Sequence, residues 1–377
     1  MRGERVMSDQ PGIAPERVGL DVERAAGTLR AGGLVAFPTE TVYGLGADAE
    51  NVDAVERVFA VKGRPSTHPL IVHLSGARQL PDWVAEVPDA ARRVADRFWP
   101  GPVTLVLRRG RRVPRAVTGG LETVALRVPD HPVARALLTA FGGGVAAPSA
   151  NRFGSVSPTA AAHVGDGLGA DVDYVLDGGP CAVGVESTIV DLTGAPAILR
   201  PGGVTREDLE RALGCSVPVR ARSAVRVPGQ HPSHYAPRAR VVLVEPGQVI
   251  GHAEYLAAQG RRVGVLLPPE FAGGAGACAG QRVIAVPDSG ARYARRLFEF
   301  LRDFDRHECE VVVASVPTPD GLGLAIADRL RRAAGSRSQT AATPGCSAVA
   351  ERGDEVFEVG GAGCFDQDEI VGTKDST

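Results

Sequence analysis

The feature that most constrains the fold is an irregular segment, residues 217–238, that divides the chain into two regions. This segment is rich in proline, arginine and histidine and has the period of neither a helix nor a strand. After it, apolar strands alternate regularly with amphipathic helices, a pattern typical of a parallel sheet. Before it, strands and helices alternate less strictly. A chain of 377 residues has room for two domains, so we expect two α/β domains joined by a linker that covers a site.

The first of these domains is predicted to occupy residues 20–216 and to be a mixed α/β fold. Its strands are expected at 34–39, 69–74, 103–108, 123–128, 186–192 and 197–200. Its helices are expected at 21–31, 51–61, 132–141, 158–164 and 205–213. The helix at 158–164 is predicted to start behind Ser157 as its cap, with Pro158 in its first position.

The second domain, residues 239–335, is predicted to be a smaller parallel, Rossmann-like α/β domain. Strands are expected at 240–245, 262–268, 282–287 and 310–316, and helices at 248–258, 291–304 and 324–334. The glycine-rich stretch 272–280 is predicted to be a flexible loop. Residues 1–19 are assigned to an N-terminal extension. Residues 336–377, which hold few apolar side chains, are predicted to be a disordered acidic tail.

Composition excludes several classes of protein. No run of eighteen apolar residues is present, so no membrane span is expected, and the charged start lacks the apolar stretch of a signal peptide. The net charge of −2 does not require a nucleic-acid partner. The six cysteines are widely separated, which favours free thiols in a reducing compartment over disulfides or a zinc site. We therefore expect a cytoplasmic protein.

Common catalytic motifs are missing. The chain contains neither the GxxxxGK(S/T) sequence of a P-loop nor the GxSxG sequence of an α/β hydrolase. His231 and His234 have the wrong spacing for a metal pair on a helix and lack nearby carboxylates. Gly321 and Gly323 follow a predicted strand, but the third glycine of a dinucleotide-binding loop is missing, so they are interpreted as the turn that starts a helix.

Lysine is almost absent from this chain. Of 42 basic residues only Lys62 and Lys374 are lysine, and Lys374 lies in the predicted tail. Arginine has evidently replaced lysine wherever it is tolerated. The retention of Lys62 indicates a position that needs a compact ammonium group and has no room for a planar guanidinium group.

Four polar clusters interrupt the apolar strands of the first domain. They occupy residues 37–49, 62–73, 146–159 and 184–202. Taken singly, each has an ordinary structural explanation: a turn, a half-buried histidine or a solvated arginine. Taken together, strand ends that carry Lys, Arg, Ser, Thr and His favour a pocket for a polyanion over a plain hydrophobic core.

The sequences of these clusters resemble one family. The motifs, in chain order, are FPTETVYGLGADA (37–49), KGRP (62–65), HPLIVH (68–73), FWPGPVTLVL (98–107), TVALRVPDHP (123–132), AAPSANRFGSVSPT (146–159), GVESTIVDL (184–192) and ILRPG (198–202). Together they resemble the YrdC-like family. HYAP (234–237) and GLGLAIADRLRRAA (321–334) extend the likeness to its longer members, the two-domain L-threonylcarbamoyladenylate synthases. The likeness covers roughly residues 20–335.

The resemblance implies a fold and a reaction. The fold is a twisted mixed sheet with a concave polar pocket, followed by the Rossmann-like domain. The reaction joins L-threonine, bicarbonate and ATP into L-threonylcarbamoyladenylate, with release of pyrophosphate, in the presence of Mg²⁺. The product supplies a downstream tRNA threonylcarbamoyl transferase complex, and the resemblance does not require the chain itself to bind RNA.

The resemblance also implies roles for individual residues. Lys62 and Arg64 are the catalytic candidates, and no metal ligand is assigned. The ATP contacts fall on Arg64, His68, Thr123, Ser149, Asn151, Ser157, Arg200 and Tyr235. The threonine contacts fall on Thr41, His73, Arg127, Ala147 and Ser187. The linker departs from the family pattern, because Pro232 stands where the family has a tyrosine. The nucleotide contact of that tyrosine is therefore expected either to be lost or to be taken over by His231 or Tyr235.

Two other functions fit parts of the sequence. A YrdC-like carbamoyl transferase that acts on another acceptor would share the first domain, but it needs an additional carbamoyl phosphate-processing domain or metal motif that is not visible here. An RNA-binding module would use an arginine-lined face, but aromatic residues make up only 5% of the chain and offer few stacking surfaces.

The retained lysine gives a first prediction. Lys62→Arg should lose most activity while the protein still folds, because a guanidinium group needs more room than an ammonium group. Pyrophosphate release and the circular dichroism spectrum of the purified variant measure the two effects. Near-normal turnover of a soluble Lys62→Arg protein would show that the lysine was retained by chance.

Overall fold

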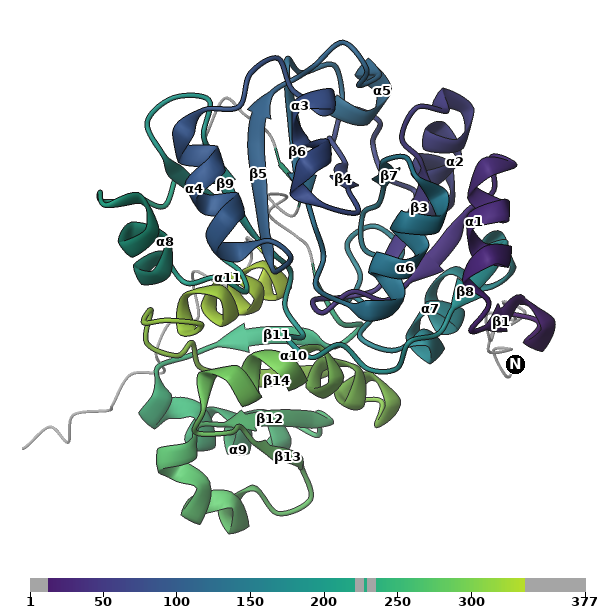
Figure 1. Cartoon of the computed structure of the whole chain (residues 1–377). Helices are drawn as coiled ribbons and strands as arrows, with labels where there is room; N and C mark the ends of the chain where they lie inside the picture. Colours follow the sequence, from purple (N-terminus) through teal and green to yellow (C-terminus); the bar gives the residue numbers. More distant parts are fainter. Residues whose placement is uncertain (1–12, 221–226, 229–234, 336–377) are drawn as a thin grey trace, which may run out of the picture. The chain divides into compact units, whose positions relative to one another are not determined.

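The computed structural model describes residues 13–220, 227–228 and 235–335. These residues form two sheets, labelled in Figure 1. The first is a mixed sheet in the order β1-β8-β2-β3-β7-β4-β6-β5-β9-β10, and the second is a four-stranded parallel sheet in the order β11-β14-β12-β13. The predicted fold class is therefore confirmed. The predicted tail, residues 1–12 of the extension, and Pro232, His231 and His234 of the linker lie outside the described residues.

The first sheet is built from ten short strands and is flanked by helices. The strands are β1 (Val18–Gly19), β2 (Val35–Phe37), β3 (Gly44–Asp48), β4 (Ile71–His73), β5 (Val103–Arg108), β6 (Thr123–Arg127), β7 (Val145–Ala146), β8 (Tyr174–Leu176), β9 (Thr188–Asp191) and β10 (Ala197–Arg200). The helices are α1 (Val22–Arg30), α2 (Val52–Lys62), α3 (Leu80–Trp83), α4 (Asp89–Phe98), α5 (Arg115–Thr118), α6 (Pro132–Phe141), α7 (Ala161–Leu168) and α8 (Arg206–Leu213).

The second sheet is buried on both faces. Its strands are β11 (Arg240–Leu243), β12 (Val263–Leu267), β13 (Arg282–Ala285) and β14 (Val311–Ala314), and its helices are α9 (Val249–Ala258), α10 (Gly290–Arg306) and α11 (Gly323–Ala334). Alternate residues of a strand point to opposite faces. In β14, Val312 and Ala314 pack with α10 and α11, whereas Val313 packs with α9. This arrangement explains the continuous apolar runs of these strands.

Polar residues of the first domain lie at the ends of neighbouring strands. His73 ends β4 and Arg127 ends β6, and the two residues are paired in a parallel ladder. Ser187 immediately precedes β9, and Arg200 ends the antiparallel neighbour β10. The polar residues therefore gather at one edge of a sheet whose strands are otherwise buried and apolar, as the sequence predicts.

Two of the predicted elements are wrong in detail. The helix expected at 158–164 is α7, which starts at Ala161 behind Ala160. Ser157 does not cap it, because its hydroxyl donates to Glu186, and the carbonyl of Pro158 accepts from the Tyr43 amide. The loop expected at 272–280 falls largely within a 3₁₀ helix, Pro269–Cys278, that buries Cys278.

Two expectations on composition can be compared with the structure. Cys181, Cys215, Cys278 and Cys309, the described cysteines, are free thiols. Within the described ranges, no helix combines the length and the apolar character that crossing a membrane requires.

Candidate active site

Most of the predicted site residues line one cavity of the first domain. From the predicted threonine set these are Thr41, His73, Arg127, Ala147 and Ser187, and from the predicted ATP set Arg64, Ser149, Arg200 and Tyr235. The cavity volume is only about 40 Å³. Pockets that enclose a small-molecule ligand usually measure about 300–1,000 Å³, so the cavity as it stands is too small for a nucleotide.

Arg127 is held by polar groups on its own side of the cavity. Its guanidinium group lies 2.7 Å from a carboxylate oxygen of Glu40 and donates to the Thr41 hydroxyl at 2.9 Å and to the Gly101 carbonyl at 3.3 Å. Arg127 and Glu40 are 3% and 6% exposed. The ion pair with Glu40 keeps the arginine in place at the end of β6, where the cavity begins.

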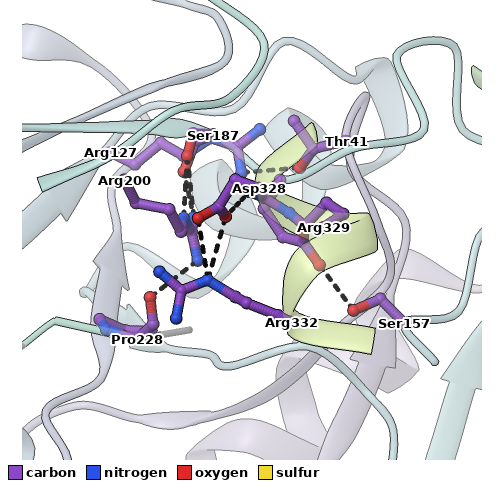
Figure 2. Close-up of polar contacts among 10 residues, drawn as sticks. Thr41, Arg127, Ser157, Ser187, Arg200, Pro228, Asp328, Arg329 and Arg332 are labelled. Atoms are coloured by element: carbon purple, nitrogen blue, oxygen red, sulfur yellow. Dashed lines mark hydrogen bonds and ion pairs between the residues drawn. The ribbon is translucent and has the colours of Figure 1, made fainter. Parts of the chain in front are cut away.

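Arg200 ties the sheet to the linker. Its Nη2 donates to the carbonyl and the hydroxyl of Ser187 at 2.9 and 3.2 Å, and its Nη1 donates to the carbonyl of Pro228 at 3.1 Å (Figure 2). Burial lowers the pKa of Arg200. Its hydrogen-bond partners are carbonyls and a hydroxyl group, and no carboxylate of the described residues forms an ion pair with it, so this arginine brings positive charge to the side of the cavity.

Arg64 is the third cation of the cavity. Gly63 ends α2 in the left-handed conformation, with φ of 62°, and this turns the chain so that Arg64 points toward the cavity. Its Nη2 donates to the Pro69 carbonyl at 2.9 Å, but its Nε is buried without a hydrogen bond. Burial lowers the pKa of Arg64 to about 10. The unused N–H group is a donor available to a ligand.

Lys62 does not line the cavity. Its ammonium group donates to the carbonyl of Ser149 at 2.5 Å and to the carbonyl of Asn151, so it fastens the segment that carries the serine. Burial, followed by repulsion from Arg64, lowers the pKa of Lys62 well below its usual range. The close approach of two carbonyls is what a compact ammonium group permits and a guanidinium group does not. These contacts make Lys62 a positioning residue, and its catalytic role remains a prediction.

The second domain contributes a residue that sequence reasoning missed. Arg329 of α11 is fully buried, and its Nε donates to Glu186 at 2.7 Å. The other oxygen of Glu186 accepts from Ser157 at 2.6 Å. Figure 2 shows Arg329 reaching from α11 toward this group. The sequence pattern that could have revealed Arg329 is its position on the apolar face of the predicted helix, three residues after the buried Ile326.

Tyr235 lines the cavity and contacts two residues of the second domain, Arg329 and Phe298. The guanidinium carbon of Arg329 is 5.0 Å from the centre of its ring, and the ring stacks on Phe298 at 5.7 Å between centroids. Its backbone has a φ of 62°, unusual for a residue with a side chain. Tyr235 therefore forms one wall of the cavity in this conformation.

His73 is an uncharged member of the site. It is 4% exposed, and burial, reinforced by the positive charge of Arg127, lowers its pKa to about 3. At neutral pH the imidazole is therefore neutral and adds no positive charge. It can act on a ligand through packing and hydrogen bonding only.

Four other predicted ATP contacts, besides Lys62 of the catalytic pair, do not line the cavity in this conformation. His68 is half-buried with its ring 5.6 Å from Phe153, and Thr123 begins β6 away from the strand end that carries Arg127. Asn151 donates to two nearby carbonyls while its side-chain oxygen is buried without a partner. Ser157 is engaged by Glu186. Their roles toward ATP stay predictions.

Comparisons with known proteins identify the family. Residues 27–202 match the Sua5/YciO/YrdC family model, described as "Telomere recombination", and residues 204–335 match the model described as "Threonylcarbamoyl-AMP synthase, C-terminal domain". The threonylcarbamoyl-AMP synthase of Pyrococcus abyssi is 43% identical over 328 residues, which cover 83% of this chain and 94% of that protein. This chain belongs to the threonylcarbamoyl-AMP synthase family.

Other family members agree over both domains. The threonylcarbamoyl-AMP synthase of Bacillus subtilis is 41% identical over 333 residues, covering 84% of this chain and 93% of that protein. The crystal structure of P. abyssi Sua5 complexed with L-threonine aligns with a TM-score of 0.77 and 41% identity, over 83% of this chain and 94% of that chain. The resemblance predicted from the motifs is thus confirmed.

A magnesium ion has no ready set of protein ligands here. Within the described ranges no three His, Cys, Asp or Glu side chains gather into a metal site. Glu186 is the carboxylate that lines the cavity, and its two oxygens are already engaged by Ser157 and Arg329. The described residues therefore do not fit a magnesium ion held directly by the protein.

The buried ion pair predicts a specific loss of stability. Arg329→Met leaves the carboxylate of Glu186 buried without its cation, which should lower the free energy of unfolding by about 3–5 kcal/mol. Arg331→Met, on the exposed face of the same helix, should change it by about 0.5 kcal/mol or less. Urea unfolding of both variants measures the difference. Equal midpoints for the two variants would contradict a structural role for the Arg329–Glu186 pair.

The neutral histidine predicts how stability depends on pH. Because the pKa of His73 is about 3 in the folded protein and roughly 6.5 in an unfolded chain, the unfolded state binds the extra proton between these values. Stability should therefore fall as the pH is lowered from about 6.5 toward 4. His73→Gln should make this fall shallower by up to about 1.4 kcal/mol per pH unit. Melting curves at several pH values measure it, and identical slopes in both proteins would refute it.

Proposed function

We propose that this chain condenses L-threonine, bicarbonate and ATP into L-threonylcarbamoyladenylate, releasing pyrophosphate and water. The observation that carries the proposal is a charge imbalance around the cavity. Five cations are buried there, namely Lys62, Arg64, Arg127, Arg200 and Arg329. The carboxylates that pair with them are the buried Glu40 and Glu186 and the partly buried Asp328, so the cations outnumber the carboxylates. A buried cation without a counter-ion costs several kcal/mol, and a polyanionic substrate would offset that cost.

The threonine end of the site is the side that Arg127 occupies. A charge-assisted contact between its guanidinium group and a carboxylate of the substrate contributes about 1.5–3 kcal/mol. Thr41 and Ser187 add hydroxyl groups, and the neutral His73 with Ala147 supplies a surface of low charge. The relative from P. abyssi was crystallised with L-threonine, which supports this choice of amino acid.

The ATP end is the side of Arg64 and Arg200. Neither arginine forms an ion pair with a described residue, and Arg64 has an unused N–H group at its Nε. The carbamate of threonine must attack the α-phosphorus of ATP, which brings two anions together. At an effective dielectric constant of 20, each pair of unit charges 4 Å apart costs about 4 kcal/mol. Fixed arginines lower that cost without reorganising during the reaction.

The reaction needs no protein nucleophile. The amine of threonine adds to carbon dioxide, supplied by bicarbonate with loss of water, and gives a carbamate. A carbamate oxygen then forms a bond to the α-phosphorus, and the bond to the pyrophosphate oxygen breaks. The described residues act by binding, by stabilising charge and by excluding water from the short-lived carbamate.

The linker must move before ATP can bind. The carbonyl of Pro228 accepts a hydrogen bond from Arg200, and Tyr235 forms a wall of the cavity. The volume left in the cavity is about 40 Å³. We infer that ATP displaces the Pro228 carbonyl from Arg200 and that the tyrosine ring shifts to meet the nucleotide. This agrees with the expectation that Tyr235 replaces the family's usual linker contact.

The remaining participants are inferred from the chemistry. Mg²⁺ enters with the phosphates of ATP and is held by them and by water, since the residues that the structure describes offer no ligand set. The product is an activated, water-labile mixed anhydride, so a tRNA threonylcarbamoyl transferase complex in the same compartment, the cytoplasm, should consume it. The arginines of the cavity are buried and therefore cannot serve the alternative function of an RNA-binding face, which needs exposed cations.

Pyrophosphate release tests the proposal. The full chain with ATP, Mg²⁺ and bicarbonate should release pyrophosphate when L-threonine is present and at a far lower rate without it or without bicarbonate. The double variant Glu40→Gln, Arg127→Met removes both charges of a buried pair, so no charge is left unpaired. It should raise the KM for threonine by about 10- to 100-fold and that for ATP much less. Equal pyrophosphate release with and without threonine would refute the proposed function.

A further inference from the structure

A second cavity lies wholly within the second domain, away from the residues assigned to catalysis. It opens at the carboxyl ends of the four parallel strands, where β12 runs into Pro268 and β14 runs into Ser315. In open α/β sheets, ligands bind in the crevice outside these strand ends. The cavity volume is about 330 Å³, within the usual range for sites that bind small molecules.

The walls of this crevice are apolar and rigid. Leu266 and Ile326 contribute aliphatic surface, and Pro246, Pro268 and Pro317 contribute proline rings with little freedom to move. Such apolar, rigid walls suit the ring system of a ligand.

Two hydroxyl groups in the crevice have no partner. Tyr293 of α10 is 5% exposed and Ser315 is 9% exposed, and both line the cavity. Neither hydroxyl forms a hydrogen bond with any residue that the structure describes, and burial raises the pKa of Tyr293. The hydroxyl oxygens of both residues are open to the cavity, so their hydrogen-bonding capacity is available to an occupant. Two such groups facing one cavity can both bond to the same ligand.

The charge of the rim narrows the choice of occupant. Glu270, Asp288 and Asp320 line the crevice, whereas no lysine, arginine or histidine does so among the described residues. Asp288 is paired with Arg292 at 2.6 Å. Asp320 lies just before α11, where its charge already offsets the positive end of that helix. A phosphate group therefore finds no cation in the lining, while sugar hydroxyls or amino groups find acceptors.

We propose that this crevice binds a nucleoside without phosphate groups, with the base between the proline and aliphatic walls and its hydroxyl and amide groups bonded to Tyr293, Ser315 and the carboxylates of the rim. Carboxylates at strand ends commonly accept hydrogen bonds from ribose hydroxyls in folds of this type. The site differs from the ATP site of the first domain in charge: its lining is acidic, whereas that of the first domain is basic. The basic site therefore favours a ligand that carries phosphate groups, and the acidic site favours one without them.

Isothermal titration calorimetry on the full chain tests this inference. L-threonine and a non-hydrolysable ATP analogue are added first, so that the first-domain site is filled. Uridine and adenosine are the probes, and uridine 5′-monophosphate is the phosphorylated comparison. At least one nucleoside should bind once per chain with a Kd of about 1 mM or lower, and the monophosphate should bind about tenfold more weakly than uridine.

Tyr293→Phe locates the binding. This variant removes one hydroxyl group that has no partner, so the melting temperature should be unchanged or higher, while nucleoside affinity should fall about five- to tenfold. Ser315→Ala should act in the same direction. Tyr255→Phe, on the exposed surface of α9, is the matched control and should leave binding unchanged.

Three results would overturn the inference. They are no nucleoside binding below about 10 mM, equal binding by the wild type and both hydroxyl variants, or a monophosphate that binds as tightly as uridine. None of these readouts involves turnover, so the inference stands or fails separately from the proposed reaction.

Discussion

The burial of positive charge at the edge of the first sheet is the constraint on which the site depends. Arg64 and Arg200 are removed from water and donate hydrogen bonds to carbonyl and hydroxyl groups, and burial lowers the pKa of both. Burying these charges lowers the free energy of unfolding, and the packing of the hydrophobic strands behind them must offset this cost. The benefit is that the cations are already fixed and dehydrated when a polyanion arrives, so little reorganisation is needed.

The second domain takes part in this electrostatic arrangement. Arg329 closes an ion pair with Glu186, and Glu186 in turn holds Ser157. One carboxylate thus links α11 with the polar loop of the first domain. The same helix contributes Ile326 to the nucleoside crevice, three residues from Arg329. An occupant of the crevice would therefore contact α11 at Gly323 and Ile326. The next turn of the same helix carries Arg329, which holds Glu186 beside the cavity of the first domain.

The sequence predicted what is local and missed what is paired over long distances. Strand ends with polar residues could be recognised from the order of the motifs, and the structure brings His73, Arg127 and Arg200 to one cavity. The ion pair between Arg329 and Glu186 joins residues 143 positions apart, and no local pattern shows which acid an arginine will meet. Ser157 failed as a predicted helix cap for the same reason, since a distant carboxylate competes for its hydroxyl.

An anion can bind Arg200 only if its contacts are worth more than the hydrogen bond that Arg200 donates to the Pro228 carbonyl. Inorganic phosphate or sulfate could replace that carbonyl with one or two contacts, and would gain little by the exchange. A nucleoside triphosphate can use the other fixed arginine and an adenine contact in the same event, so it gains much more. A closed cavity therefore discriminates by the number of simultaneous contacts. The most abundant small anions in solution are rejected without any group that repels them.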